Sequence, residues 1–321
     1  MSEWKAISER KPPIVARLSR NSFIPLAEAT ICPSVSSPYL CLMQVLLETI
    51  PGYEGERLYT AYYPASASEG RGTILWVHGY AEHSGRYLPI IEYLLERGWH
   101  SVAWDLRGHG RSTGRRGYIS DIEEYLADLT AVWTHWHKRI PEPVVLFGHS
   151  LGGLIALRYR QKYSTLWKPR LTIISAPLIQ LKVEVPHYKR ILAQIAAQFF
   201  PTLSLPSGLR PTDLTHDPAE AHAYATDPLV FKIATAGWFA AIQRAQIDLW
   251  KDLPRLTDEA FLFLIPEKDP ICDSEATLRF YEHLPTPHKH LLIYPESYHE
   301  PLHETFRDKV FQDIAQFLQN L

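Results

Sequence analysis

The chain has 321 residues, of which 46% are hydrophobic and 21% charged, and this composition excludes a disordered or fibrous protein. Its 33 basic and 35 acidic residues give a formal net charge of −2, so nucleic acid is not an expected partner. The three cysteines, Cys32, Cys41 and Cys272, are too few for a disulfide framework and lack metal-ligand spacing; we expect a reducing compartment, the cytoplasm.

Residues 1–44 are predicted to be an irregular N-terminal extension, because they are interrupted by prolines and show neither the strand nor the helix period. The extension is either a docking arm or a tail draped over the domain. The first residues lack the apolar core of a signal peptide, and Pro25, Pro33 and Pro38 break the apolar stretch that follows. We therefore expect neither a signal peptide nor a membrane span.

From residue 45 onward, short apolar runs typical of strands alternate with helical stretches. The expected strands are Val45–Ile50, Arg57–Tyr63, Thr73–Val77, Ser101–Trp104, Val144–Phe147, Leu171–Ser175, Ala260–Ile265 and His290–Tyr294. The expected helices are Leu88–Arg97, Ile122–His137, Leu151–Tyr163, Ser274–His283 and Thr305–Gln319. The alternation predicts an α/β fold with a mostly parallel central sheet and helices on both faces, built from residues 45–175 and 260–321.

One connection, residues 176–259, is far longer than the roughly 10 to 12 residues that a crossover needs, and it predicts an inserted helical cap. The run YKRILAQIAAQFF places apolar residues from Ile191 to Phe200 on one helical stripe, which either packs against the main domain or faces lipid. A second helix is expected to begin at Asp227-Pro228, a capping residue before a proline at the first helical position, and to run through Trp250.

The most specific motif follows the expected strand Val144–Phe147. The run VLFGHSLGG passes from strand residues through Gly148-His149-Ser150-Leu151-Gly152 into a helix without proline. A sharp strand-to-helix turn of this kind leaves no room for a Cβ at the two flanking glycines and exposes the central side chain. Ser150 is therefore a candidate nucleophile, and the alternative is a glycine-rich turn whose serine only caps the helix.

A serine hydroxyl needs an adjacent base, and the base needs an acid to hold its tautomer. Asp269, in the loop PEKDP after the strand Ala260–Ile265, is the candidate acid, because open α/β sheets build their sites at this edge. Glu267 or Asp273 could substitute for it, and Asp269 could instead serve the turn before Pro270.

His299, in the loop PESYHEP after the strand His290–Tyr294, is the candidate base. The chain order of nucleophile, acid and histidine is the one expected for a nucleophile elbow on such a sheet. His303 competes with it, but His303 falls toward the start of the last helix, where we expect a histidine that faces solvent. His288 and His290 share a strand face, yet metal sites need three or more ligands, so we expect no metal there.

Acyl transfer also requires donors aimed at the developing oxyanion. The backbone N–H of Leu151, directly after the candidate nucleophile, is one candidate. The backbone N–H of Tyr80, in the turn His78-Gly79-Tyr80 after the strand Thr73–Val77, is the other.

Four separate segments of the sequence resemble those of a known enzyme family. HGYAEHSGRY at 78–87, DLRGHGRSTGRRG at 105–117, GHSLGG at 148–153 and YHEPLHE at 298–304 resemble the monoacylglycerol lipase and lysophospholipase branch of the α/β-hydrolase superfamily. EKDPICD at 267–273 also fits, with Asp269 in the acid position and Cys272 where relatives often carry a cysteine. The likeness covers residues 45–321. Tyr80 departs from it, because many relatives have a smaller residue there, and its ring would narrow the pocket mouth.

The resemblance implies a cap that acts as a lipid-facing lid, which favours membrane contact through Ile191 to Phe200. It also implies structural roles for several residues of the shared blocks. We expect Glu82, His83 and Arg86 to tie the oxyanion loop together, and Asp105, Arg107 and His109 to shape a turn beside it.

Together these features predict a serine carboxylester hydrolase that cleaves a monoacylglycerol or lysophospholipid, peripheral to a membrane and without metal or organic cofactor. The alternatives are peptidase or acyltransferase chemistry on the same residues, or a lipid-binding module without catalysis. Acidic cap residues such as Glu220 and Asp227, if placed to hold a free amine, would favour the peptidase.

Overall fold

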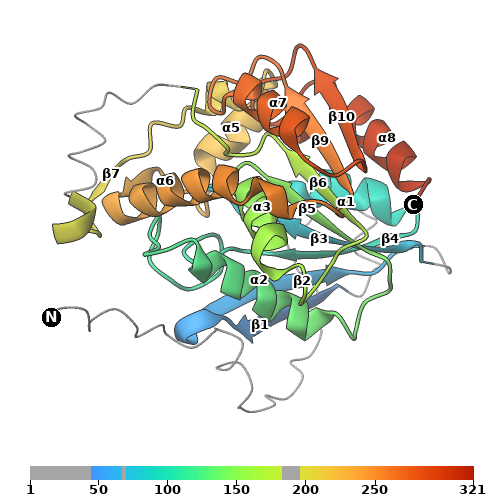
Figure 1. The fold of residues 1–321 in the computed structure, drawn as a ribbon, viewed down its shortest axis with the longest axis horizontal. Helices are drawn as coiled ribbons and strands as arrows, with labels where there is room; N and C mark the ends of the chain where they lie inside the picture. Colours follow the sequence, from blue (N-terminus) through green and yellow to red (C-terminus); the bar gives the residue numbers. More distant parts are fainter. Residues whose placement is uncertain (1–44, 67–69, 183–195) are drawn as a thin grey trace, which may run out of the picture.

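The structure is a computed structural model that describes residues 45–66, 70–182 and 196–321 (Figure 1). An eight-stranded sheet lies at its centre, in the order β1-β2-β4-β3-β5-β6-β9-β10. β1 and β2 pair antiparallel with their neighbours, and the remaining pairs are parallel. The strands are β1 Leu46–Pro51, β2 Arg57–Tyr63, β3 Gly72–Val77, β4 Trp99–Trp104, β5 Val144–His149, β6 Leu171–Ser175, β9 Phe261–Pro266 and β10 Lys289–Tyr294.

Helices cover both faces of the sheet, as the sequence predicted. One core cluster packs α1 and α8 against the first face, and the other packs α2, α3, α6 and α7 toward the second. The helices are α1 Leu88–Leu95, α2 Glu123–Trp136, α3 Leu151–Tyr163, α5 Pro218–Thr226, α6 Ala236–Lys251, α7 Ser274–His283 and α8 Arg307–Leu318. The strand and helix predictions of the main domain are confirmed to within about two residues at each end, which is the normal uncertainty of an element boundary.

The central strands are buried along their whole length, because helices lie above and below them. Every residue of β3, β5, β6 and β9 is buried, which explains why these strands are continuous apolar runs rather than alternating ones. Their parallel register brings the carboxyl ends of β5, β6, β9 and β10 to one edge. The loops that leave this edge carry the candidate site residues.

The chain between β6 and β9 forms an insertion that contains α5, α6 and a short antiparallel pair, β7 Ser204–Pro206 with β8 Ile233–Thr235. The prediction that its second helix begins at Asp227-Pro228 is wrong. Asp217-Pro218 instead begins α5, with the Asp217 side chain accepting from Ala219 N at 2.9 Å. Asp227 lies past the end of α5, where its side chain accepts from Leu229 N at 2.7 Å, and α6 begins after Thr235.

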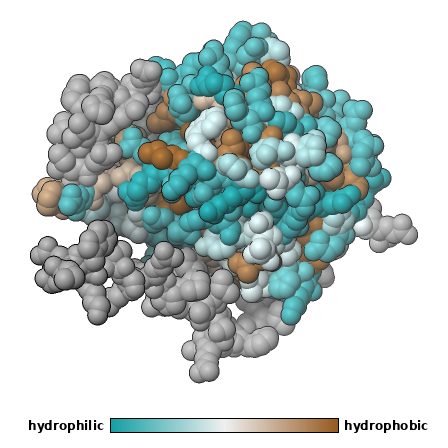
Figure 2. Space-filling view, in the orientation of Figure 1, coloured by the Kyte–Doolittle hydropathy of each residue, from teal (hydrophilic) through white to brown (hydrophobic). Residues whose placement is uncertain are grey.

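The predicted amphipathic stripe is described only in part, because residues 191–195 lie outside the described residues. Its last residues are solvent-facing, with Phe199 and Phe200 exposed by 66% and 67%. Figure 2 shows apolar surface at the left edge of the molecule, where Figure 1 places the segment that leads into β7. The predicted extension 1–44 also lies outside the described residues. No helix in the described ranges is long and apolar enough to cross a bilayer.

Candidate active site

Ser150 occupies a strained corner between β5 and α3. Its φ is 52° and its ψ is −113°, a conformation that non-glycine residues rarely adopt. A Cβ at Gly148 would collide with the backbone of Gly152, and a Cβ at Gly152 would collide with the Val77 carbonyl. The Ser150 side chain makes no helix-capping hydrogen bond. The alternative of a serine that only caps the helix is therefore wrong.

The structure brings Ser150, His299 and Asp269 together at the carboxyl edge of the sheet. His299 Nε2 lies 3.0 Å from Ser150 Oγ, and His299 Nδ1 lies 2.7 Å from Asp269 Oδ2. All three residues are buried. With Nδ1–H donating to the carboxylate, Nε2 is left as the acceptor for the Ser150 hydroxyl, which is the tautomer that a general base requires.

The other acids near Asp269 are placed for different tasks. Asp269 Oδ1 accepts from Ile271 N at 2.7 Å and from Cys272 N at 2.9 Å, which fixes the carboxylate toward His299. Asp273 caps α7 by accepting from Ala276 N at 3.1 Å, and Glu267 is exposed. Neither Asp273 nor Glu267 takes the place of Asp269.

Electrostatics distinguish the two histidines beside Ser150. Burial alone would lower the pKa of His299, but the charge and hydrogen bond of Asp269 outweigh it and raise that pKa above the ordinary value. His149 has no hydrogen-bonded carboxylate among the described residues, and burial together with the neighbouring His299 lowers its pKa to about 4. His299 is thus the imidazole suited to take up a proton, and His149 stays neutral.

The backbone N–H groups of Tyr80 and Leu151 make no hydrogen bond to any described residue. The turn that carries Tyr80 is fixed by Glu82, whose Oε1 accepts from Gly79 N at 2.6 Å and from the Tyr87 hydroxyl at 2.8 Å. Tyr80 itself donates its hydroxyl to the Ile233 carbonyl at 2.7 Å. The turn that carries the Tyr80 N–H is thus fixed by hydrogen bonds, and it approaches Ser150, because a Cβ at Gly79 would lie 3.3 Å from Ser150 Cβ.

A buried ionic network links the Tyr80 turn to the His299 loop. Arg86 Nη1 lies 2.6 Å from Glu82 Oε2 and 2.7 Å from Glu300 Oε1, and its Nη2 lies 2.6 Å from Glu300 Oε2. Burial by itself raises the pKa of both carboxyls, but the Arg86 charge lowers the pKa of Glu82 and holds that of Glu300 well below its usual range. One guanidinium thus fixes both loops.

His303 corrects an expectation from the sequence. We expected it to face solvent, but it is buried, with Nε2 2.9 Å from the Arg86 carbonyl and Nδ1 3.1 Å from Glu300 Oε2. The 3-10 turn Pro301–His303 carries it inward before α8 begins at Arg307. It supports the ionic network and does not contact Ser150.

The predicted structural roles of the neighbouring blocks are confirmed. His83 Nε2 lies 2.8 Å from Asp227 Oδ2, which joins the Tyr80 turn to the insertion. Asp105 accepts from the Ser84 N–H at 2.8 Å and from its hydroxyl at 2.6 Å. Arg107 and His109 also hold buried hydrogen bonds within this region. None of these side chains contacts the Ser150 hydroxyl.

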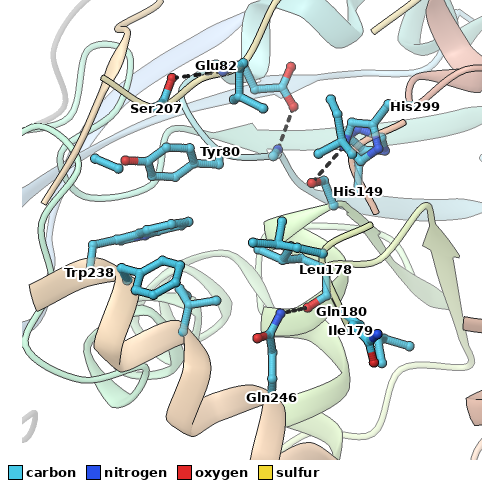
Figure 3. A pocket seen from close by; sticks show the side chains of 18 of the residues that line it. Tyr80, Glu82, His149, Leu178, Ile179, Gln180, Ser207, Trp238, Gln246 and His299 are labelled. Carbon is cyan, nitrogen blue, oxygen red and sulfur yellow. Dashed lines mark hydrogen bonds between the residues drawn. The ribbon is translucent and has the colours of Figure 1, made fainter. Parts of the chain in front are cut away.

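A cavity of about 770 Å³ opens above Ser150 and runs along α6 (Figure 3). One face of α6, from Trp238 to Trp250, forms its long wall, and twelve residues of helix rise correspond to about 18 Å. Glu82 and Glu300 are the charged residues on its wall, and no lysine or arginine among the described residues lines it. The apolar lining residues are Leu178, Ile179, Leu181, Leu209, Leu214, Ala234, Trp238, Phe239, Ile242, Ile247, Trp250 and Ile271.

This arrangement is the one expected of a serine hydrolase. It combines a strained, buried serine with a histidine and a carboxylate in hydrogen-bonded series and with two backbone N–H groups that have no partner among the described residues. A family model described as serine aminopeptidase, S33, of the group Hydrolase_4, matches residues 68–306. The chain belongs to this family of α/β-hydrolases.

The relatives of this α/β-hydrolase include lipases. The monoglyceride lipase of Rattus norvegicus is 30% identical over 277 residues, which are 83% of this chain and 88% of that protein. The crystal structure of Paleococcus ferrophilus monoacylglycerol lipase has a TM-score of 0.73 and 30% identity, covering 81% of this chain and 98% of that one. An abhydrolase domain-containing protein of Dictyostelium discoideum is 30% identical over 251 residues, but the chain spans only 26% of its length.

Several site residues of the hydrolase were not singled out from the sequence. Glu300 follows the predicted histidine and His149 precedes the predicted serine, so the sequence shows that both are near the site. Their burial and pairing depend on how the loops fold. Tyr224, from α5, and the glutamines of α6 also line the cavity. Among the described residues, the one cluster of three potential metal ligands is Asp269, Cys272 and His299. Asp269 and His299 in that cluster already bond to each other.

Proposed function

We propose that this α/β-hydrolase cleaves neutral lipid monoesters through an acyl-enzyme on Ser150, with His299 as the general base and Asp269 as its partner. The observation that carries the proposal is the hydrogen-bonded series Ser150–His299–Asp269 at the end of a mostly apolar cavity. Its relatives include proteins named for hydrolysis of monoacylglycerol.

The geometry supports the following sequence of steps. Ser150 Oγ attacks the ester carbonyl while its proton passes to His299 Nε2, and the carbonyl oxygen becomes an oxyanion held by the N–H groups of Tyr80 and Leu151. The carbon–oxygen bond to the alcohol then breaks, and His299 returns the proton to the leaving oxygen. Water, activated by His299, attacks the acyl-enzyme and releases the fatty acid and free Ser150. Asp269 stabilises the imidazolium in both halves.

The cavity favours a neutral headgroup over a phosphate-bearing one. No lysine or arginine lines its described wall, so a lysophospholipid phosphate would have no cation to pair with and would meet Glu82 and Glu300. A glycerol headgroup can instead hydrogen-bond with the polar groups around Ser150, including Tyr224 and His149. Monoacylglycerol is therefore the preferred substrate in this proposal, and lysophospholipid the weaker one.

Peptidase chemistry is the second candidate, because the family description names an aminopeptidase. It would require an unpaired carboxylate to hold the free amine of the peptide. Glu220 pairs with Arg307 at 2.5 Å, and Asp227 pairs with His83 at 2.8 Å. Glu82 and Glu300 are both paired with the Arg86 guanidinium. The described carboxylates thus favour the ester over the peptide.

The insertion, residues 176–259 of the proposed cap, supports a role as a lid at a lipid surface. It supplies the α6 wall of the cavity, and exposed Phe199, Phe200, Leu203 and Leu205 lie on or next to β7. Apolar side chains of this kind can insert into the headgroup region of a bilayer. We place the enzyme in the cytoplasm, peripheral to a membrane, in line with the free thiol of buried Cys272.

The test compares wild type with Ser150→Ala on 1-monoacylglycerol, lysophosphatidylcholine and an aminoacyl amide of matched size. Wild type should cleave the monoacylglycerol best, and Ser150→Ala should lose roughly four orders of magnitude or more in kcat. Ser120→Ala, at an exposed serine, is the control. Ester turnover that survives in Ser150→Ala would reject the mechanism, and preferential cleavage of the amide would favour the peptidase.

A further inference from the structure

One segment of the insertion lies directly on the turn that carries the Tyr80 N–H. It comprises residues 227–235, links α5 to α6 and includes β8, and we call it the clamp segment. Three hydrogen bonds tie it to the turn: from the Tyr80 hydroxyl to the Ile233 carbonyl at 2.7 Å, from the Phe231 N–H to the Ala81 carbonyl at 3.2 Å, and from His83 Nε2 to Asp227 Oδ2 at 2.8 Å. The turn is therefore held from the insertion as well as from the main domain.

The Tyr80 turn needs this external support because of its own backbone. Ala81 has a φ of 65°, in the left-handed region that is unfavourable for any residue with a Cβ. Gly79 has no Cβ to limit rotation of the peptide unit that carries the Tyr80 N–H. From the main domain, Glu82 fixes the Gly79 N–H, which lies on the other side of Gly79 from that peptide unit. The Tyr80 side of the peptide unit is held by the clamp segment, through the Tyr80 hydroxyl and the Ala81 carbonyl.

The clamp segment is itself anchored to the main domain. At its end, Thr235 donates its N–H and its hydroxyl to the Gly117 carbonyl, at 3.1 Å and 2.7 Å. In its middle, the Phe231 ring packs against the His109 ring, with 4.9 Å between the centroids. The segment can therefore act as a fixed support for the turn, rather than as a loop that follows the turn when it moves.

Asp227 joins the clamp segment to the turn and uses both of its side-chain oxygens. Oδ1 accepts from the Leu229 N–H at 2.7 Å, which closes a turn within the segment. His83 Nδ1 accepts from the Gly85 N–H at 3.1 Å, so Nε2 carries the proton and donates to Asp227 Oδ2. An asparagine of the same shape would place its amide N–H groups against one of these two donors. Asp227→Asn therefore breaks one hydrogen bond and changes the packing little.

We propose that the clamp segment positions the oxyanion donor of Tyr80, and that Asp227 is a positioning residue for the chemical steps at Ser150. The inference rests on the proposed function of the Ser150 site. A backbone N–H stabilises a developing oxyanion most when it is aimed at that oxygen beforehand. Loosening the clamp segment should therefore slow the steps in which the oxyanion forms and spare the binding of the alkyl chain to the apolar wall. The insertion thus serves catalysis as well as covering the cavity.

The experiment compares wild type with Asp227→Asn, Tyr80→Phe and Asp217→Asn, on a 1-monoacylglycerol and a p-nitrophenyl ester of the same acyl chain. Tyr80→Phe keeps the backbone N–H but removes the bond to the Ile233 carbonyl, so it loosens the same turn at a second point. Asp217→Asn is the matched control, because Asp217 caps α5 in the other Asp-Pro pair of the insertion and asparagine caps equally well. Labelling of Ser150 by a fluorophosphonate counts folded sites, and rates are taken per labelled site. Tyr80→Phe decides the test if Asp227→Asn fails to label.

Two inhibitors separate positioning from general damage to the cavity. A trifluoromethyl ketone with the acyl chain of the substrate adds to Ser150 and places an oxyanion against the N–H groups of Tyr80 and Leu151. A 1-alkylglycerol ether of equal length fills the cavity but has no carbonyl to attack. Asp227→Asn should lower kcat about tenfold with KM within about twofold, a part of the roughly 10²–10³-fold effect of a whole oxyanion donor. The Ki of the ketone should rise about tenfold and that of the ether should not change.

Tyr80→Phe should shift kcat and the ketone Ki in the same direction, and Asp217→Asn should match wild type. Unchanged kcat in both Asp227→Asn and Tyr80→Phe, with labelled sites intact, would overturn the inference. An equal rise in the Ki of both inhibitors would also overturn it, since the loss would then not depend on the oxyanion. A wild type that does not label would reject the proposed function and this inference with it. Activity confined to the p-nitrophenyl ester would reject only the glycerol headgroup, and the same difference between the inhibitors there would still support the inference.

Discussion

At the scale of single residues, the proton chemistry of the site depends on Asp269. Its carboxylate raises the pKa of His299, and protonated His299 cannot accept the Ser150 proton, so activity is lost as pH falls through that raised pKa. The acid limb of kcat/KM should therefore lie above the ordinary histidine value of about 6.5.

Asp269→Asn should move that limb to lower pH, because removing the negative charge lowers the pKa of His299, and should reduce kcat roughly 10⁴-fold through the wrong tautomer. Asp273→Asn, at the capping acid of α7, should leave the limb in place. Rate profiles between mildly acidic and mildly alkaline pH decide this. If the acid limb moved in Asp273→Asn and not in Asp269→Asn, the partner of His299 would be Asp273 and our assignment would be wrong.

Tyr80 joins the turn beside Ser150 to the insertion. Its hydroxyl donates to the Ile233 carbonyl and its ring packs against the Trp238 ring. Tyr80→Phe leaves a carbonyl without its donor and should lower the free energy of unfolding by about 1 kcal/mol. Tyr80→Ala also removes the ring and should cost about 3 kcal/mol. Urea unfolding measures both.

Tyr118→Phe is the control for the Tyr80 variants. The Tyr118 ring lies near Gly237 at the same boundary, and its hydroxyl has no hydrogen bond to a described residue. Its midpoint in urea should match that of wild type. If Tyr80→Phe also matched wild type, the bond to Ile233 would contribute nothing to stability.

At the scale of elements, Arg86 holds the Tyr80 turn and the His299 loop together through two buried carboxylates. Arg86→Met would leave Glu82 and Glu300 buried without a cation, and should cost about 3–5 kcal/mol of unfolding free energy at neutral pH. Arg279→Met, which removes an exposed ion pair with Glu275 on α7, should cost at most about 1 kcal/mol.

The stability that Arg86→Met loses should depend on pH, because Arg86 lowers the pKa values of the Glu82 and Glu300 carboxyls. In wild type, Glu82 and Glu300 stabilise the fold above the unfolded glutamate pKa of about 4.3, and this stability is lost as pH falls through their lower folded values. Without Arg86, burial raises both pKa values, so the variant loses stability as pH rises above about 4.3. The difference from wild type should narrow on going from pH 7 toward pH 5. A constant difference would show that the carboxylates are not the cause.

The elements of the main domain were predictable because buried parallel strands and amphipathic helices leave distinct patterns in the sequence. The elbow glycines predicted Ser150, and the loops after β9 and β10 predicted its acid and histidine, since parallel strands bring those loops to one edge. The choice of Asp269 over Glu267 and Asp273 came mostly from the family resemblance. The catalytic roles of Ser150, Asp269 and His299 are the subject of the proposed tests.

The insertion was less predictable, because its local signals are ambiguous. Two Asp-Pro pairs lie ten residues apart, and only Asp217-Pro218 begins a helix. The second pair is held in a turn by His83, a contact with a distant part of the chain that no local pattern reveals. His303 was misjudged for a similar reason, since its burial depends on Arg86 and Glu300 together.

At the scale of the whole molecule, we expect the exposed apolar residues beside β7 to bind the enzyme to the bilayer that contains its substrate. Phe199→Ser with Phe200→Ser removes two side chains that are 66% and 67% exposed, and should weaken binding to phosphatidylcholine vesicles about tenfold or more. Vesicle co-sedimentation measures the change. Leu166→Ser with Ile293→Ser, at exposed apolar residues outside the insertion, should bind as wild type does. If both double variants lost vesicle binding equally, membrane binding would not depend on the residues beside β7.

Trp238 and Trp250 stand at the two ends of the cavity wall. Because Trp250 is 37% exposed, an alkyl chain lying against it would exclude water from the indole and move its fluorescence emission to shorter wavelength. The enzyme therefore carries an intrinsic optical reporter of occupancy. In a Ser150→Ala background that reporter would follow binding alone, so affinity could be titrated in real time without turnover or an added dye.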